Sequence, residues 1–297
     1  MTLPRLWFAK VQALGNDFVW VLDPVDAAAA SGIGQHAPLI CNRHFGVGAD
    51  GMVLWDGAEN GAEVWFLNAD GTQAEVCGNG LRAVAAAGRD LGLFAAGRVD
   101  FRSAGVCFSV IVRAPDSPLA ASLGIPRHEA NPGVDRVLKA WSSEGSLVFM
   151  PNPHIVVFHS PQAPEQREKL AGELACQVVG GANVGFCTAE EGLLHLQVWE
   201  RGVGWTLACG SGAAGAAAVA LRMGFVSEGV VPVRQPGGML RVWFDDSGCA
   251  WIEGIASLVF VGTVGGESWV DVGSPRDLPR TSGAQYLGFD AGFRSLH

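Results

Sequence analysis

Charge is scarce in this sequence. Charged residues make up 16% of its 297 residues, and there is 1 tyrosine. The 29 acidic residues outnumber the 20 basic ones, which gives a formal net charge of −9. Because nucleic acids are polyanions that attract clustered Lys and Arg, this balance argues against a nucleic-acid-binding protein.

Lysine is the rarest of the common charged residues and occurs only as Lys10, Lys139 and Lys169. None of the three lies in a motif suited to a Schiff base with pyridoxal phosphate. The sequence therefore argues against a pyridoxal-dependent enzyme.

Paired cysteine motifs are also missing. The seven cysteines form no CxxC pair, and the histidines have no ligand spacing, so we expect no metal site. Arg5, Lys10 and Asp17 interrupt the first apolar stretch, which predicts no export signal. An odd number of cysteines in a chain of this length is typical of the reducing cytoplasm.

A long uncharged run extends from Gly202 to Leu221 and is as long as a membrane span. Its residues are mostly Gly and Ala, which bury little apolar area against lipid and favour close packing inside a protein. We expect no membrane association.

Hydrophobic periodicity predicts a mixture of strands and helices. Alternation favours strands at 106–113 and 239–244. Two Ala-rich segments, 79–91 and 212–223, have the pattern of deeply buried helices, and 162–173 reads as a solvent-facing helix. The chain is thus expected to have the α+β class, with a peripheral tail after residue 265.

The two Ala-rich helices share an entry motif. Residues 77–80 read Cys-Gly-Asn-Gly, and residues 209–212 read Cys-Gly-Ser-Gly. This repetition indicates an internal duplication with one central helix in each copy. The prolines between residues 114 and 135 place a boundary there. The other five cysteines lack this context and are expected in the core: Cys41, Cys107, Cys176, Cys187 and Cys249.

A cysteine at a helix start faces unpaired backbone N–H groups and the positive end of the helix dipole. This placement predicts a lowered thiol pKa, and the adjacent glycines let a carboxylate approach the N–H groups. Two opposed copies would bracket one α-carbon with two sulfurs. One sulfur could then remove a proton while the other supplies one, which is the chemistry of a racemase.

Other functions remain open at this point. Gly46, Gly48 and Gly51 form a GxGxxG pattern, as do Gly210, Gly212 and Gly215, which would suit a dinucleotide oxidoreductase. Cys77 or Cys209 with His154 could form a cysteine hydrolase. A catalytically inactive binding protein is a third alternative.

The motifs together resemble the diaminopimelate epimerase family, cofactor-independent enzymes that interconvert LL- and meso-diaminopimelate. The resemblance runs from residue 10 to about 264 through ALGNDF (13–18), CNRHFGVGADG (41–51), NADGTQAEVCGNGLRAVA (68–85), NPH (152–154), ANVGF (182–186) and WERGVGWTLACGSGAA (199–214). It implies two pseudo-symmetric domains, 1–122 and 123–256, each a curved, mostly antiparallel sheet around a central helix. Residues 257–297 would form a return strand to the first domain plus a tail.

The resemblance also implies the roles of individual residues. Cys77 and Cys209 would be the catalytic pair, with His154 and Glu200 adjusting their pKa values. The implied substrate-binding residues are Asn16, Asn68, Gly78, Asn79, Asn152, Asn183, Glu200, Arg201, Gly210 and Ser211. The family needs no cofactor, binds a small amino acid and forms a homodimer.

Several residues depart from the family pattern. Pro151 replaces a common Gly, Ala214 and Gly215 alter the start of the second Ala-rich helix, and Phe260 stands where some members have a dimer-contact Tyr. Trp205 stands where the family usually has Glu, four residues before Cys209. The expected reaction is epimerisation of LL-diaminopimelate for lysine and peptidoglycan precursor synthesis in the cytoplasm. The alternative is a cofactor-independent racemase of another free amino acid, with its specificity altered around Trp205.

Overall fold

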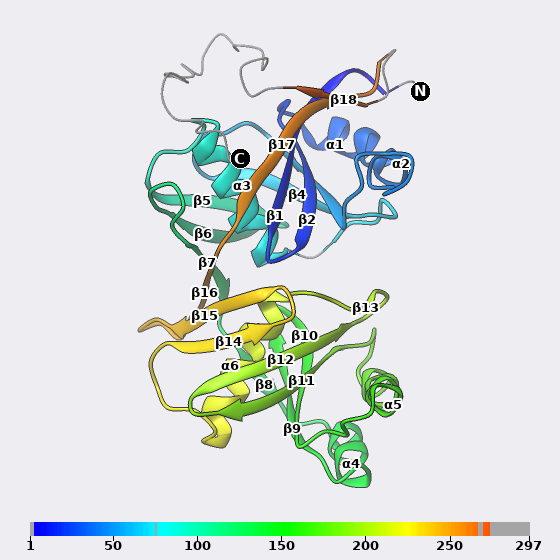
Figure 1. Ribbon diagram of the computed structural model, residues 1–297, viewed down its shortest axis with the longest axis vertical. Helices are drawn as coiled ribbons and strands as arrows, with labels where there is room; N and C mark the ends of the chain where they lie inside the picture. Colours follow the sequence, from blue (N-terminus) through cyan, green and yellow to red (C-terminus); the bar gives the residue numbers. More distant parts are fainter. Residues whose placement is uncertain (1–2, 75, 267–269, 274–297) are drawn as a thin grey trace, which may run out of the picture.

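The structure is a computed structural model that describes residues 3–74, 76–266 and 270–273. The protein consists of two halves stacked along its long axis (Figure 1). Each half is a curved sheet wrapped around one long helix. The first half contains β1 (Leu6–Ala13), β2 (Asn16–Val21), α1 (Ala27–Gly34), α2 (Ala37–Ile40), β3 (Gly51–Trp55), β4 (Ala62–Asn68), α3 (Gly78–Asp90), β5 (Gly97–Ser103), β6 (Val106–Val112), β7 (Leu119–Gly124), β17 (Ser257–Val264) and β18 (Val270–Gly273).

The second half contains the corresponding elements around helix α6. They are β8 (Arg127–Glu129), α4 (Pro132–Ala140), β9 (Glu144–Met150), β10 (Asn152–Phe158), α5 (Pro164–Ala175), β11 (Asn183–Glu190), β12 (Leu193–Glu200), β13 (Gly204–Trp205), α6 (Gly210–Met223), β14 (Val231–Gln235), β15 (Gly238–Phe244) and β16 (Ala250–Gly254).

Strand pairing repeats in the same order in the two halves. From β1 to β7 the successive pairs are antiparallel, parallel, antiparallel, parallel, antiparallel and antiparallel. The same order runs from β9 through β10, β11, β12, β14 and β15 to β16. Helix α3 connects β4 to β5, and α6 occupies the corresponding place before β14. The repeated pairing explains the duplicated sequence motif and confirms the expected α+β architecture.

The chain crosses between the halves twice. After β7 it enters the second half, where β8 pairs with β9, and after β16 it returns to the first half, where β17 pairs with β1. Strands β7 and β16 pair with each other at the junction. The sheets of the two halves are joined by this pairing. The domain limits at residues 122 and 256 stay a prediction.

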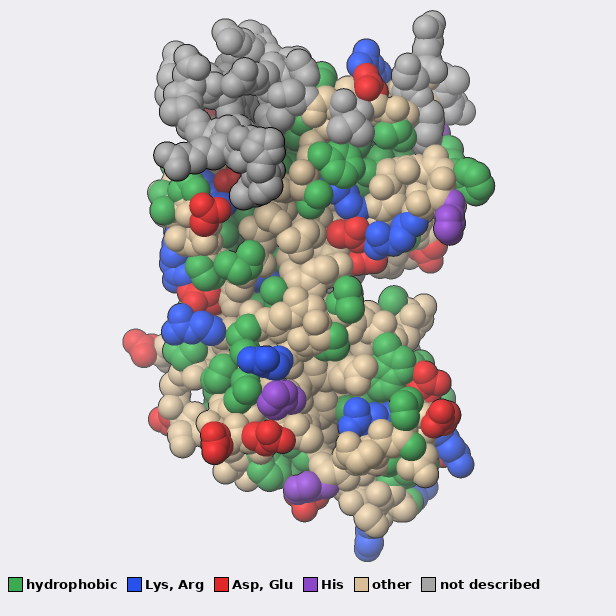
Figure 2. All heavy atoms as spheres, in the orientation of Figure 1, with side chains coloured by type: hydrophobic (Ala, Val, Ile, Leu, Met, Phe, Trp, Pro, Cys, Tyr) green, Lys and Arg blue, Asp and Glu red, His purple; other side chains and the backbone are tan. Residues whose placement is uncertain are grey.

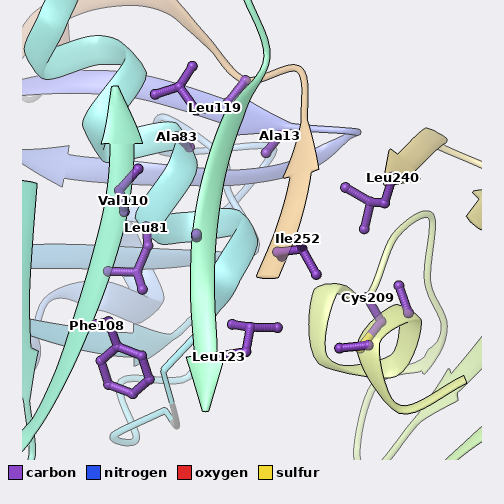
Figure 3. Packing of buried hydrophobic residues seen from close by; sticks show 14 of the residues in the cluster. Ala13, Leu81, Ala83, Phe108, Val110, Leu119, Leu123, Cys209, Leu240 and Ile252 are labelled. Carbon is purple, nitrogen blue, oxygen red and sulfur yellow. The ribbon is translucent and has the colours of Figure 1, made fainter. Parts of the chain in front are cut away.

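The two central helices are made of small residues because sheet side chains surround them. In α3 every residue from Gly78 to Gly88 is buried, and in α6 most residues are. The core cluster runs from the first half into the second, with Leu123 and Ile252 placed between the start of α3 and Cys209 (Figure 3). The core is therefore continuous across the junction of the two halves.

The expected elements occur close to their predicted limits, including the solvent-facing helix α5. Two of the cysteines expected in the core are exposed, because Cys107 lies beside the hairpin turn of β5 and β6 and Cys176 caps the end of α5. Cys41 and Cys187 are buried, and Cys249 is half-buried. No helix among the described residues is long and apolar enough to cross a membrane. Most of the predicted tail lies outside the described residues.

Candidate active site

Cys77 and Cys209 occupy the same position in the two halves. Each is the N-cap residue, with extended backbone angles, directly before α3 or α6. Both sulfur-bearing residues line one pocket of about 940 Å³ between the halves. A hollow separates the upper and lower halves at one edge of the molecule (Figure 2). The two cysteines therefore face the same space, as a two-sulfur site requires.

The pocket brings together the residues that the sequence placed at the site. Of the predicted site residues, all except His154 line the pocket. The lining includes Asn16, Asn68, Cys77, Gly78, Asn79, Asn152, Asn183, Glu200, Arg201, Cys209, Gly210 and Ser211. Residues separated by up to 195 positions thus converge on one pocket, although their individual roles stay predictions.

The glycines after the two cysteines are needed for packing. A Cβ atom on Gly78 would lie 2.8 Å from Cδ1 of Ile252, and one on Gly210 would lie 2.7 Å from the same atom. Both helix starts therefore pack against the same atom of Ile252 in β16. These glycines were expected to admit a ligand carboxylate, and in the structure a methyl group at either position would also clash with the Ile252 side chain.

The sulfur of Cys77 has a polar neighbour from the first hairpin. Its Sγ lies 3.4 Å from Asn16 Oδ1, which can accept a hydrogen bond from the thiol. The Asn16 amide is held in this orientation because its Nδ2 donates to the Asp50 carboxylate at 3.0 Å. The backbone N–H groups of Asn79 and Gly80 also favour the thiolate of Cys77.

The sulfur of Cys209 has different partners. It accepts from the Gly212 N–H at 3.3 Å and lies 3.6 Å from Ser211 Oγ. The backbone N–H of Cys209 donates to Gln235 Oε1 at 2.8 Å, which fixes the residue from behind. The Glu200 carboxylate lies close enough to interact with the thiol.

Burial reverses the predicted shift of the thiol pKa values. Desolvation raises the pKa of Cys77 to about 11 and raises the pKa of Cys209 well above its ordinary range, and Glu200 raises both. The helix-start N–H groups act in the expected direction but are outweighed by burial. The expectation of a lowered pKa is therefore wrong for the ligand-free pocket.

His154 supports the second helix start from behind the pocket wall. Its Nε2 lies 2.9 Å from Asn152 Oδ1 and 3.0 Å from Ser211 Oγ. Burial lowers the pKa of this imidazole to about 3, so it is neutral at physiological pH. Since Asn152 Oδ1 can only accept, the proton belongs on Nε2 when that bond is made.

The far side of the pocket carries the second group of predicted binding residues. Asn183 Oδ1 accepts from the backbone N–H of Arg201 at 2.9 Å, and Thr206 donates to Glu200 Oε1 at 2.7 Å. Burial raises the pKa of Glu200. A carboxylate, a guanidinium and amides on one wall could recognise an amino acid with its own charged groups.

Several residues near the site were missed by the sequence analysis. Arg43 and Asp50 line the pocket and bond to each other, and Arg43 also forks onto Asp17, which pairs with Lys10. This network supports Asn16 through Asp50. Arg43 and Asp50 lie within the motif at 41–51, which the sequence analysis quoted without assigning them a role.

Trp205 directs its polar atom away from the cysteines. Its indole Nε1 donates to the Glu168 carboxylate of α5 at 2.8 Å, and its ring lies 5.6 Å from that of Phe186. The residue lines the pocket, but its indole is anchored on the outer layer of the second half. The described residues contain no group of three or more His, Cys, Asp or Glu side chains that could hold a metal ion.

Comparison with known proteins matches the sequence to one family. The model of the diaminopimelate epimerase family matches residues 8–122 and 146–259. A diaminopimelate epimerase of Synechococcus sp. (strain JA-3-3Ab) is 35% identical over 296 residues, covering 87% of this chain and 98% of that protein. A diaminopimelate epimerase of Desulforudis audaxviator (strain MP104C) is 35% identical over 273 residues, covering 86% and 98%.

Solved structures share the fold at low sequence identity. A hydroxyproline epimerase from Agrobacterium vitis matches with a TM-score of 0.65 and 12% identity, covering 89% of this chain and 92% of that one. A PhzF-family phenazine biosynthesis protein from Bacillus anthracis matches with a TM-score of 0.63 and 14% identity, covering 88% and 99%. At such identities the likeness concerns the fold alone.

Proposed function

Because the chain belongs to the diaminopimelate epimerase family, we propose that it inverts one α-carbon of LL-diaminopimelate to give the meso form, with Cys77 and Cys209 as its acid–base pair. One observation carries the proposal: both cysteines begin buried helices and line the same pocket from opposite halves of the chain. Fold alone does not determine activity, so the argument rests on this geometry and on the family match.

The α-carboxylate of the substrate is held by the two helix starts. Gly78 and Gly210 line the pocket, and the first N–H groups of α3 and α6 have no partner within their helices. These donors and the positive ends of the two helix dipoles attract a carboxylate. As the α-proton leaves, negative charge moves onto the carboxylate oxygens, where the same N–H groups stabilise it.

Proton transfer uses the two sulfurs in turn. The thiolate of one cysteine forms an S–H bond with the α-proton, and the electron pair of the C–H bond delocalises into the carboxylate. The thiol of the other cysteine then gives its proton to the opposite face of the carbon and becomes the thiolate. The enzyme ends with the protonation states exchanged, so one turnover in the reverse direction, or exchange with solvent, restores it.

The raised thiol pKa values give the substrate a part in activation. Burial of both sulfurs raises their pKa values and so opposes ionisation. The α-ammonium of a bound amino acid adds a positive charge beside the reacting carbon, which favours a nearby thiolate. Glu200 has the opposite effect, since its carboxylate raises the pKa of both cysteines and so favours their protonated forms.

The far end of diaminopimelate carries a second carboxylate and a second ammonium. Glu200 is suited to the ammonium and Arg201 to the carboxylate, while Asn16, Asn68, Asn152 and Asn183 offer neutral amides for orientation. Asn79 takes part through its backbone, because its side-chain amide is bonded to Ala208 and Arg82. His154 acts on Cys209 through Ser211, whose hydroxyl lies between them.

The proposed activity serves lysine and peptidoglycan precursor synthesis, which agrees with a cytoplasmic location and free cysteines. The homodimer implied by the resemblance also stays a prediction. The oligomeric state can be measured on the purified chain by size-exclusion chromatography.

A chirality assay tests the proposed function. Purified protein is incubated with LL-diaminopimelate and, separately, with common L-amino acids, with a thiol reductant and no added cofactor. We expect the meso form to appear from LL-diaminopimelate alone. Cys77→Ala and Cys209→Ala should each lose at least about 10²-fold in rate, the usual contribution of a positioned acid or base.

Cys107→Ala is the matched control, because this cysteine is exposed and outside the pocket, and its rate should equal that of the wild type. Inversion of another amino acid but not of diaminopimelate would contradict the proposed substrate. Wild-type turnover that survives either pocket substitution would contradict the two-sulfur mechanism.

A further inference from the structure

A fully buried arginine lies behind the first catalytic helix start. Arg82 is 0% exposed in α3, and within the described part of the chain its Nε has no hydrogen-bond partner. Burial lowers the pKa of the guanidinium to about 10, so it remains charged at neutral pH. A buried cation is costly unless a negative charge compensates it, and among the described residues Cys77 would supply such a charge in its ionised form.

The side chain of Arg82 reaches the first turn of its own helix. Helical side chains lean toward the N-terminus of the helix, and the Arg82 guanidinium accordingly donates to Asn79 Oδ1 at 2.6 Å. Its second nitrogen donates to the carbonyl of Ile255 at 3.4 Å, in the crossing between β16 and β17. The positive charge is thus placed beside the helix start that Cys77 caps.

Asn79 extends this contact to the second half. Its Nδ2 donates at 3.2 Å to the carbonyl of Ala208, the residue immediately before Cys209. Arg82 and Asn79 therefore connect the turn that follows one catalytic cysteine to the residue that precedes the other. Both residues are 0% exposed, so solvent does not compete for these bonds.

The second half has no equivalent charge. Arg82 follows Cys77 by five residues, and the residue five positions after Cys209 is Ala214. Behind Cys209 lie instead the neutral His154, which contacts Ser211, and the Glu200 carboxylate. The backbone of the site is repeated, whereas the charges around the two sulfurs differ: Glu200 raises the pKa of both thiols, and the positive charge of Arg82 opposes that rise at Cys77.

We propose that Arg82 is a positioning residue that favours the thiolate on Cys77 over Cys209 and, through Asn79, holds the two helix starts at a fixed separation. The inference deepens the proposed function, on which the catalytic use of the asymmetry rests. When the bound substrate favours a thiolate, Cys77 ionises in preference to Cys209 and acts as the base, while Cys209, beside Glu200, acts as the acid. After a turnover Cys77 carries the proton, which Asn16 Oδ1 is placed to accept as a hydrogen bond.

Thiol alkylation without substrate tests this inference. Cys77 and Cys209 are reacted with iodoacetamide at pH 9, and each modified peptide is quantified by mass spectrometry over time. Below its pKa, the rate of a thiol is proportional to its thiolate fraction. Arg82→Gln retains a donor for Asn79 but loses the charge, and we expect alkylation of Cys77 to slow roughly tenfold, a pKa change of about one unit. Alkylation of Cys209 should not slow.

Two further variants separate charge from shape. Arg82→Lys keeps a positive charge, so Cys77 should react within about threefold of the wild-type rate, a pKa change of less than half a unit. Arg89→Gln removes an arginine from the far end of the same helix and should leave both rates unchanged. Circular dichroism checks folding, and Arg82→Met replaces Arg82→Gln if the latter does not fold.

The inference is overturned if Cys77 reacts as fast in Arg82→Gln as in the wild type, or if Arg82→Lys is slowed as much as Arg82→Gln. Because the assay contains no substrate, its result is independent of turnover. A protein that does not epimerise diaminopimelate but shows the expected alkylation rates would refute the proposed function and leave the assignment of Arg82 standing.

Discussion

Replacing Gly210 by alanine tests the contact that sets the spacing of the two helix starts. The new Cβ would lie 2.7 Å from Cδ1 of Ile252 and 3.2 Å from Oδ1 of Asn79. Neither neighbour can move freely, because Ile252 and Asn79 are both 0% exposed. Overpacking of this kind costs about 1–3 kcal/mol. Gly210 is the first residue of α6, so alanine gains less here than the roughly 1 kcal/mol it gains over glycine inside a helix. We expect Gly210→Ala to lower the free energy of unfolding.

A second substitution should partly reverse this loss. Ile252→Val removes the clashing Cδ1 atom and, by itself, costs about 0.5–1.5 kcal/mol because it leaves a small cavity. In the double variant the alanine methyl occupies part of that cavity. The two losses of unfolding free energy should therefore not add. The loss in the double variant should be smaller than the sum of the two single losses by about 1 kcal/mol or more. The contact with Asn79 remains, so recovery is incomplete.

Urea unfolding of the four proteins in this cycle measures the coupling. Turnover should follow the same order, because a displaced α6 moves Cys209 relative to Cys77, and a shift of about 1 Å can cost roughly 10²-fold in rate. Gly172→Ala is the control, since a Cβ at this position of α5 meets nothing within 4 Å. It should be neutral or stabilising. Additive costs in the cycle, or a Gly210→Ala protein as stable as the wild type, would refute the proposed packing.

Three further predictions concern the surroundings of the site. Because burial lowers the pKa of His154 to about 3, the unfolded chain takes up a proton below pH 6.5 that the folded imidazole excludes, so stability is lost as the pH falls from 6.5 toward 3. The free energy of unfolding should therefore fall less between pH 7 and pH 5 in His154→Gln than in the wild type, by up to about 2 kcal/mol. The same fall in both proteins would contradict a buried, neutral imidazole. Trp205→Phe loses the hydrogen bond to Glu168, so its free energy of unfolding in urea should be about 1 kcal/mol lower than that of the wild type. Its KM for diaminopimelate should stay within threefold of the wild-type value; a much larger KM would place the indole against the substrate. Glu253→Gln weakens the buried acceptor shared by Arg113 and Arg241 and should cost about 1–3 kcal/mol in urea unfolding without a change in KM, whereas an unchanged midpoint would show that the two ion pairs contribute nothing.

Much of the site could be predicted from the sequence because its central residues recur. The repeated Cys-Gly-Asn/Ser-Gly entry before two Ala-rich segments marked both helix starts, since a helix that must be surrounded by a sheet needs small side chains. The expected strands and the return strand after residue 256 were also found. Local patterns of this kind retain their meaning without knowledge of the fold.

Other features depend on contacts between distant segments. That Gly78 and Gly210 share Ile252 as a neighbour follows from the pairing of β7 with β16, which no local pattern records. An arginine within an Ala-rich helix could equally face solvent, so the burial of Arg82 became visible only with the strands around it.

The thiol pKa values show the same limitation. A helix start favours a thiolate, and the sequence indicates where a helix starts. The sequence does not show how deeply the sulfur is buried or that the Glu200 carboxylate lies beside it, and these two influences outweigh the helix start for Cys77 and Cys209.

Solvent isotope incorporation tests the two-sulfur mechanism most directly. LL-diaminopimelate is converted in deuterium oxide, and the substrate and product pools are analysed at low conversion. Two separate acid–base groups predict deuterium at the inverted carbon of the meso product and none in the recovered substrate, because the sulfur that removes the proton returns the same proton when the step reverses. Deuterium entering both pools at equal rates would show that a single exchanging base serves both faces of the carbon, and would contradict the proposed roles of Cys77 and Cys209.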